Sequence, residues 1–166
     1  MVQFRGTGYH DQVTSRNVHY RDLDSRMWGR AHFTDSTIVF ERHGGVRDRS
    51  APGKLYLIRD GTIDERTAAC RADDYRRDRC GLLVPRRVSF ASEDNDINLT
   101  VNQTSAFRSG FSEVKMLSEI SLELPDGRPR NATGITEFVD PRRLRSRFVR
   151  WISNLRIGSE ERSPLF

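Results

Sequence analysis

The chain has 166 residues, 36% of them hydrophobic, which predicts a single soluble domain with one real core. No run of about 18 apolar residues occurs, and this excludes a membrane-spanning helix. The first residues contain no apolar stretch of the kind found in a signal peptide, so we expect a cytoplasmic protein.

The charge balance is basic, with 28 lysine and arginine residues against 23 acidic ones. A basic balance raises the question of nucleic-acid binding. The arginines alternate with acidic residues, however, as they do from Arg71 to Arg79. Alternating positive and negative charge is typical of a solvated surface and not of a surface that binds the phosphates of a nucleic acid. The sequence therefore predicts no nucleic-acid partner.

Only two cysteines, Cys70 and Cys80, are present. Two cysteines in a charged segment make neither a disulfide framework nor a cysteine-rich metal site. We expect both to be free thiols, and we expect neither a bound metal nor a cofactor.

The first part of the chain has the pattern of short strands separated by polar loops. A hairpin is predicted around Asp60-Gly61, because this dipeptide suits the positive φ angles of a two-residue turn. Residues 12–25 and 43–53 are predicted loops. The strands predicted up to residue 66 are Val2–Tyr9, Met27–Phe33, Thr37–Arg42, Lys54–Arg59 and Thr62–Arg66.

The middle of the chain is less regular. The charged segment Thr67–Arg79 is compatible with a short helix or with an irregular excursion. Extended structure resumes at Leu82–Phe90, where Pro85 indicates a sheet edge or a bulge. Glu93–Asp96 is a predicted turn. The remaining predicted strands, which alternate apolar and polar residues to differing degrees, are Ile97–Asn102, Val114–Leu124 and Arg128–Val139.

In the C-terminal segment the apolar residues recur with the spacing of an α-helix. Asp140 and Pro141 have the pattern of an N-cap followed by proline in the first turn. One face of the helix then carries Leu144, Phe148, Trp151, Ile152 and Leu155. We expect this face to pack on protein; a membrane-surface helix and a dimer contact are the alternatives.

These elements together predict an all-β protein: an antiparallel β-barrel of eight or nine strands with one C-terminal helix. The barrel is expected to span residues 1–140, the helix packed on it residues 141–157, and a flexible tail residues 158–166.

Two short segments carry most of the chemistry. Side chains alternate along a strand, so Tyr9 and Asp11 share one face, and Trp28, Arg30 and His32 share another. We expect these faces to meet inside the barrel, where Arg30 can hold Asp11 or a substrate oxygen while the aromatic side chains line an apolar pocket. The alternative is a structural Asp–Arg pair beside a core tryptophan.

Both segments also resemble a known family. Residues 6–12 (GTGYHDQ) and 27–32 (MWGRAH) resemble the paired signatures of the lipocalin-like carotenoid 1,2-hydratase (hydroxyneurosporene synthase) family. The wider family includes the AttH-like proteins and fungal Diels–Alderases. A third family element, Gly-x-x-Glu, matches Gly134–Glu137. The resemblance covers about residues 3–140 and implies a lipocalin-like barrel equivalent to the second of the family's two domains.

The resemblance implies a cofactor-independent enzyme of secondary metabolism. It would hydrate, cyclise (including by Diels–Alder reaction) or isomerise a hydrophobic polyene, terpenoid or polyketide in a barrel pocket. A carboxylic acid in an apolar pocket can stay protonated and donate its proton, and aromatic faces stabilise a cation. The candidate catalytic residues are Asp11, His10, Arg30 and Glu137. The candidate substrate-binding residues are Tyr9, Gln12, Trp28, His32 and Tyr56.

Two alternatives accompany this hypothesis: a carrier that binds a lipophilic ligand without chemistry, and an interaction module that uses the arginines. Because only one of the family's two domains is recognisable, we also expect a homodimer whose partner covers the surface left by the other domain.

Overall fold

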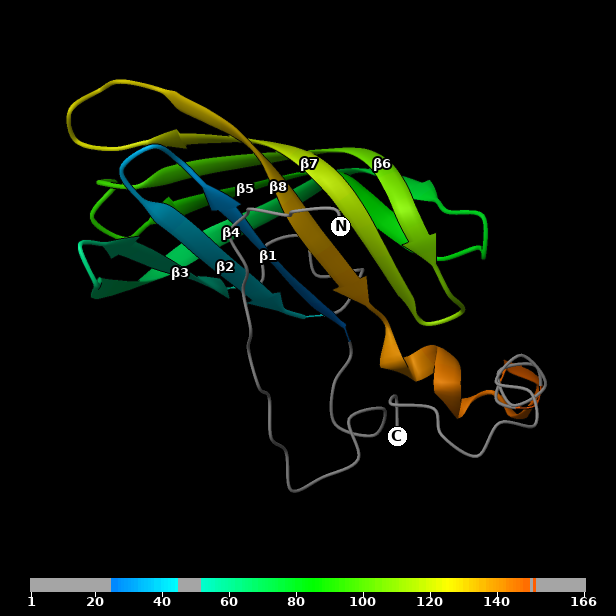
Figure 1. Ribbon diagram of the computed structural model, residues 1–166. Helices are drawn as coiled ribbons and strands as arrows, with labels where there is room; N and C mark the ends of the chain where they lie inside the picture. Colours follow the sequence, from blue (N-terminus) through cyan, green and yellow to red (C-terminus); the bar gives the residue numbers. More distant parts are fainter. Residues whose placement is uncertain (1–24, 45–51, 150, 152–166) are drawn as a thin grey trace, which may run out of the picture.

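The computed structural model describes residues 25–44, 52–149 and 151. They form a closed barrel of eight antiparallel strands, each beside its neighbours in the sequence (Figure 1). The barrel closes because β1 pairs with β8 as well as with β2. The strands are β1 Arg26–His32, β2 Thr37–His43, β3 Pro52–Arg59, β4 Thr62–Arg77, β5 Leu83–Ser92, β6 Asn98–Ser109, β7 Glu113–Glu123 and β8 Arg130–Val139.

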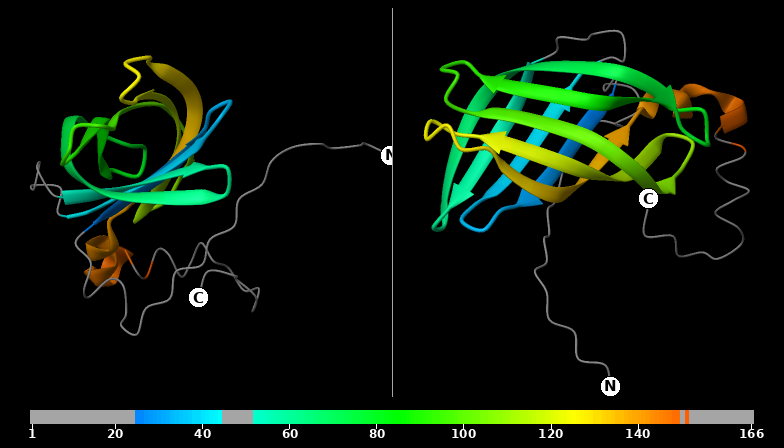
Figure 2. Two further views of the ribbon diagram at one scale, coloured as in Figure 1. Left: turned by 90° about the vertical axis from the view of Figure 1, so that its left-hand side faces the viewer. Right: turned by 90° about the horizontal axis from the view of Figure 1, so that it is seen from above.

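The predicted all-β, lipocalin-like fold is thereby confirmed, and the barrel is visible end-on in the left view of Figure 2. The strand expected at Val2–Tyr9 lies outside the described residues, as do the candidate site residues Tyr9, His10, Asp11 and Gln12.

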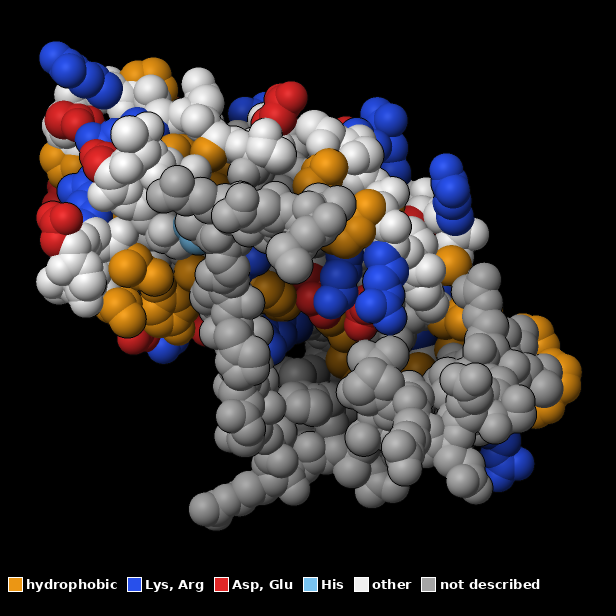
Figure 3. Space-filling view, in the orientation of Figure 1, with side chains coloured by type: hydrophobic (Ala, Val, Ile, Leu, Met, Phe, Trp, Pro, Cys, Tyr) orange, Lys and Arg blue, Asp and Glu red, His pale blue; other side chains and the backbone are white. Residues whose placement is uncertain are grey.

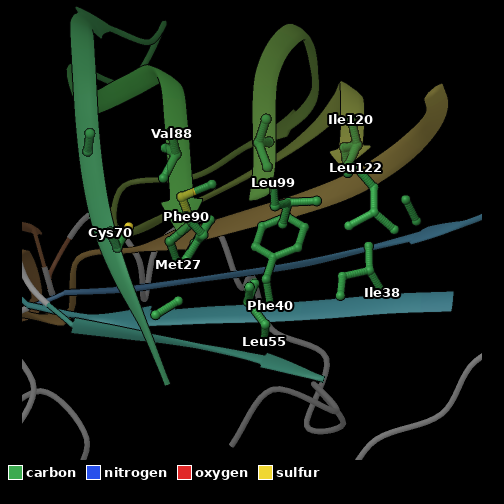
Figure 4. Packing of buried hydrophobic residues seen from close by; sticks show 14 of the residues in the cluster. Met27, Ile38, Phe40, Leu55, Cys70, Val88, Phe90, Leu99, Ile120 and Leu122 are labelled. Atoms are coloured by element: carbon green, nitrogen blue, oxygen red, sulfur yellow. The ribbon is translucent and has the colours of Figure 1, made fainter. Parts of the chain in front are cut away.

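Large apolar side chains fill the inside of the barrel. Phe40 and Phe90 meet at its centre with their ring centroids 5.4 Å apart, and Leu55, Leu99 and Met27 surround them (Figure 4). All five are at most 2% exposed. Burial of this kind contributes about 1.5–3 kcal/mol for each large side chain. The described part of the barrel is therefore closed around a packed core.

Two local predictions have different outcomes. The Asp60-Gly61 turn is confirmed, since both residues have positive φ angles, 48° and 76°. Thr67–Arg79, expected as a short helix or an irregular excursion, instead belongs mostly to the 16-residue strand β4. Its inward positions hold small side chains, Ala68, Cys70 and Ala72, while charged residues point outward. Small inward residues weaken the apolar alternation by which a strand is recognised.

The described C-terminal segment is helical at residues 141–145 and again at residues 147–149. The Asp140 carboxylate accepts a hydrogen bond from the backbone N–H of Arg142 and caps the 3-10 helix η1, Pro141–Arg145. Ser146 then adopts an extended backbone, which interrupts the helix. Beyond it, Phe148 and Trp151 are 65% and 59% exposed, so these two side chains do not show the expected packing. No helix in the described residues combines the length and apolar character needed to cross a bilayer.

The two cysteines are free thiols, as predicted, and differ in exposure. Burial raises the pKa of Cys70 to about 12, although the Arg42 charge opposes the shift. We expect a thiol reagent at pH 8 to label Cys80 in the native protein and to label Cys70 only after denaturation, because the thiolate is the reactive form. In the Cys80→Ser variant, rapid labelling of native protein would contradict this expectation.

Candidate functional site

The structure places Trp28 and Arg30 on the outside of the barrel. Along β1 the buried positions are Met27, Gly29 and Ala31, so the residues between them point outward. Gly29 faces inward beside the Phe40 ring, where a Cβ atom would clash. The prediction that Trp28 and Arg30 line the barrel interior is therefore wrong, although they do share one face.

An open groove of about 340 Å³ crosses this outer face from β1 to β4. Its apolar wall consists of Trp28, Val39, Tyr56, Ile58 and Ile63, and Ile63 is 63% exposed. Figure 3 shows hydrophobic side chains gathered over β2 and β3 beside charged ones. We call this feature the outer groove. It combines an apolar surface with a few polar groups, as ligand sites usually do.

Glu41 is the polar centre of the outer groove. One of its carboxylate oxygens accepts a hydrogen bond from the Tyr56 hydroxyl at 3.0 Å, and the other lies 3.2 Å from the Arg26 guanidinium. That second oxygen is also 3.2 Å from the His43 ring. The register explains the cluster, because Glu41 lies directly opposite Trp28 on β1 and Lys54 on β3.

The surroundings of Glu41 determine the protonation states of Glu41 and Tyr56. Burial raises the pKa of Glu41, but hydrogen bonds from Tyr56 and His43 and the charges of His43 and Arg26 outweigh it, so the pKa is lowered. Burial and the bond to Glu41 raise the pKa of Tyr56. At neutral pH, Glu41 is a carboxylate and Tyr56 a neutral phenol that donates to it.

The lowered pKa makes stability depend on pH. A carboxylate whose folded pKa lies below its unfolded value of 4.5 stabilises the protein above that value, and the contribution is lost as the pH falls through the folded pKa. We expect Glu41→Gln to lower the melting temperature at pH 7 and to have a smaller effect at pH 3. Glu65→Gln, which removes an exposed ion pair with Lys54, is the control and should change little. An equal loss at both pH values would contradict this expectation.

The described site residues do not all meet. Glu137 lies opposite Trp28 on the β8 side, and its carboxylate is 3.3 Å from the Lys115 ammonium. Arg30 lies between Val39 and Ile135 on the same outer face. His32 lies apart at the strand end, where its Nδ1 is 2.8 Å from the Thr37 hydroxyl.

Sequence reasoning missed Arg26 and Glu41. Period-two alternation places Glu41 on the face of Val39, but only the strand register brings it beside Trp28 and Tyr56. No group of three or more histidine, cysteine or acidic residues in the described part of the chain is placed to bind a metal ion.

No family model matches this chain. It is 26% identical over 165 residues to a protein named hydroxyneurosporene dehydrogenase from Chlorobaculum tepidum. The match covers 95% of this chain but only 42% of that relative, so the chain spans less than half of the relative's length.

Proposed function

We propose that the outer groove binds a hydrophobic polyene, terpenoid or polyketide, and that the protein modifies it by hydration, cyclisation or isomerisation. The observation that carries the proposal is the apolar wall of Trp28, Tyr56 and Ile58 around the ionised Glu41. The relative's name refers to an acyclic carotenoid, which has the same chemical character. A barrel interior filled by its own side chains favours the outside as the site.

The charges assign roles for a hydration. A proton adds to one alkene carbon, and the oxygen of a water molecule bonds to the other. A base then takes the extra proton from that oxygen, which leaves the alcohol. Glu41, as a carboxylate, is suited to be the base, and the Trp28 ring to stabilise the carbocation. Asp11 remains the proposed proton donor, with His10 as the other candidate in its segment. Glu137 faces Lys115, which favours a role in positioning.

A carrier without chemistry is the second candidate. It is favoured because the two carboxylates beside Trp28 both lie against cations, Glu41 against Arg26 and Glu137 against Lys115. Such groups hold a ligand without supplying a proton. A homodimer that covers the outer groove remains a proposal under either function.

Tryptophan fluorescence tests the binding. Only Trp28 remains in a Trp151→Phe protein, and hydroxyneurosporene in detergent micelles should quench it with saturation. Tyr56→Ala should weaken binding by about tenfold, and Ser121→Ala, outside the outer groove, should not change it. Quenching that rises linearly, or equally in empty micelles, would refute the proposal.

Mass spectrometry of the same mixture then separates the two functions. A product that has gained one water indicates hydration, and a new isomer of unchanged mass indicates cyclisation or isomerisation. If Asp11→Asn and Glu41→Gln abolish the product and keep the affinity, the enzyme is supported. Saturable binding with no product in the wild type supports the carrier.

A further inference from the structure

The barrel wall opens between β5 and β6, away from the outer groove. These strands pair only where Arg87–Ala91 faces Asn98–Asn102. Beyond that ladder, Leu83–Pro85 pairs with β4 alone, and the end of β6 from Gln103 pairs with β7 alone. The β4–β5 and β6–β7 turns accordingly project as two separate loops near η1 (Figure 1).

A small cavity of about 110 Å³ occupies this opening. Its floor is apolar and comes from Val84, Val114 and Met116, which are 5% exposed or less. Gln103 also lines it and is only 3% exposed. Neither the amide nitrogen nor the amide oxygen of Gln103 has a hydrogen-bond partner among the described residues. A buried amide without partners destabilises the folded protein, and a ligand that bonds to it would offset that cost.

The charge around the opening is positive. Arg76, Arg77 and Arg86 line the cavity together with the carboxylate of Asp78, and Arg76 also lies 3.5 Å from the Asp74 carboxylate. The Oδ1 atom of Asp78 accepts hydrogen bonds from the backbone N–H groups of Cys80 and Leu82, whereas its Oδ2 atom is buried and has no hydrogen-bond partner among the described residues. The Nε–H of Arg86 donates to the Gln103 carbonyl at 2.9 Å and so bridges the strands where their ladder ends. The bond is to the main chain of Gln103, and both residues line the cavity.

We propose that this opening is a binding site for a short-chain monocarboxylate. One carboxylate oxygen would accept a hydrogen bond from the Gln103 amide nitrogen, and the guanidinium groups of Arg86 and its neighbours would balance the charge. The carbon chain would lie on the apolar floor. The volume of about 110 Å³ limits the ligand to a molecule of few carbon atoms, and butyrate is the probe used to test the site.

Titration with butyrate, followed by NMR at constant ionic strength, tests the proposal. The side-chain amide signals of Gln103 should shift and saturate, and the neutral analogue butyramide should bind at least about tenfold more weakly. Arg86→Gln and Gln103→Leu should each weaken butyrate binding by about tenfold or more. Arg71→Gln removes the same charge from an exposed position of β4 and should leave the affinity unchanged.

The spectra of each variant also report whether the barrel is intact. If Gln103→Leu fails to fold, the Arg86→Gln result and the butyramide comparison decide the question. Shifts that do not saturate, equal binding of butyramide, or an equal loss in Arg71→Gln would overturn the proposal. Because the site is separate from the outer groove, failure here leaves the polyene test unaffected.

Discussion

Replacing Phe40 with alanine is expected to lower the free energy of unfolding by about 3–5 kcal/mol. The Phe40 side chain is fully buried and packs against the Phe90 ring at the centre of the barrel. The Gly29 backbone packs directly on the ring, and hydrogen-bonded strands on both sides of β1 oppose its movement into a cavity. The cavity left by the phenyl group therefore cannot collapse fully. Urea unfolding followed by circular dichroism measures the loss.

Phe148→Ala is the matched control for this prediction. It deletes the same atoms from a side chain that is 65% exposed, so the unfolding free energy should change by less than about 0.5 kcal/mol. A large loss in Phe148→Ala, or a loss below about 1 kcal/mol in Phe40→Ala, would contradict the packed interior described above.

Replacing Val39 with aspartate is expected to have the largest effect on ligand binding, a loss of affinity of at least about 30-fold. Val39 lies in the wall of the outer groove, opposite Arg30 on one side and Tyr56 on the other. A bound polyene would cover the new carboxylate and remove its water, at a cost of about 2 kcal/mol or more. Fluorescence titration of Trp28 in the Trp151→Phe background measures the affinity.

Thr100→Asp supplies the control, since it adds the same charge to an outward position of β6, outside the outer groove. Its affinity for the polyene should equal that of the starting protein. The melting temperatures of both variants should stay close to the melting temperature of the starting protein, because both positions face outward. Equal affinity of the Val39→Asp protein and its control would remove the outer groove as the ligand site.

Much of the fold follows from local sequence patterns. Alternation along β1 and β2 and the Asp60-Gly61 turn each predict their element directly. The first part of β4 is predicted as the strand Thr62–Arg66, but the part from Thr67 is not, because its inward positions Ala68 and Ala72 hold small side chains. Those residues carry too little apolar signal to reveal a strand.

The candidate site shows where local patterns end. Alternation correctly groups Trp28 with Arg30, but a period of two does not say which face is inside. The inner face of β1 has the smaller residues Gly29 and Ala31, because Phe40 already fills the space beside them. The partners of Trp28 depend on register between strands, and so Glu41 becomes visible only in the assembled barrel.

Isoleucine methyl NMR tests most directly whether the ligand binds on the outer groove or inside the barrel. Ile58 and Ile63 line the outer groove, whereas Ile38 and Ile120 are buried in the core. A protein labelled at the isoleucine δ1 methyl groups is titrated with hydroxyneurosporene in micelles, with empty micelles as the reference. The account predicts saturable shifts at Ile58 and Ile63 and unchanged signals at Ile38 and Ile120. Shifts confined to Ile38 and Ile120 would contradict it and would place the ligand inside the barrel.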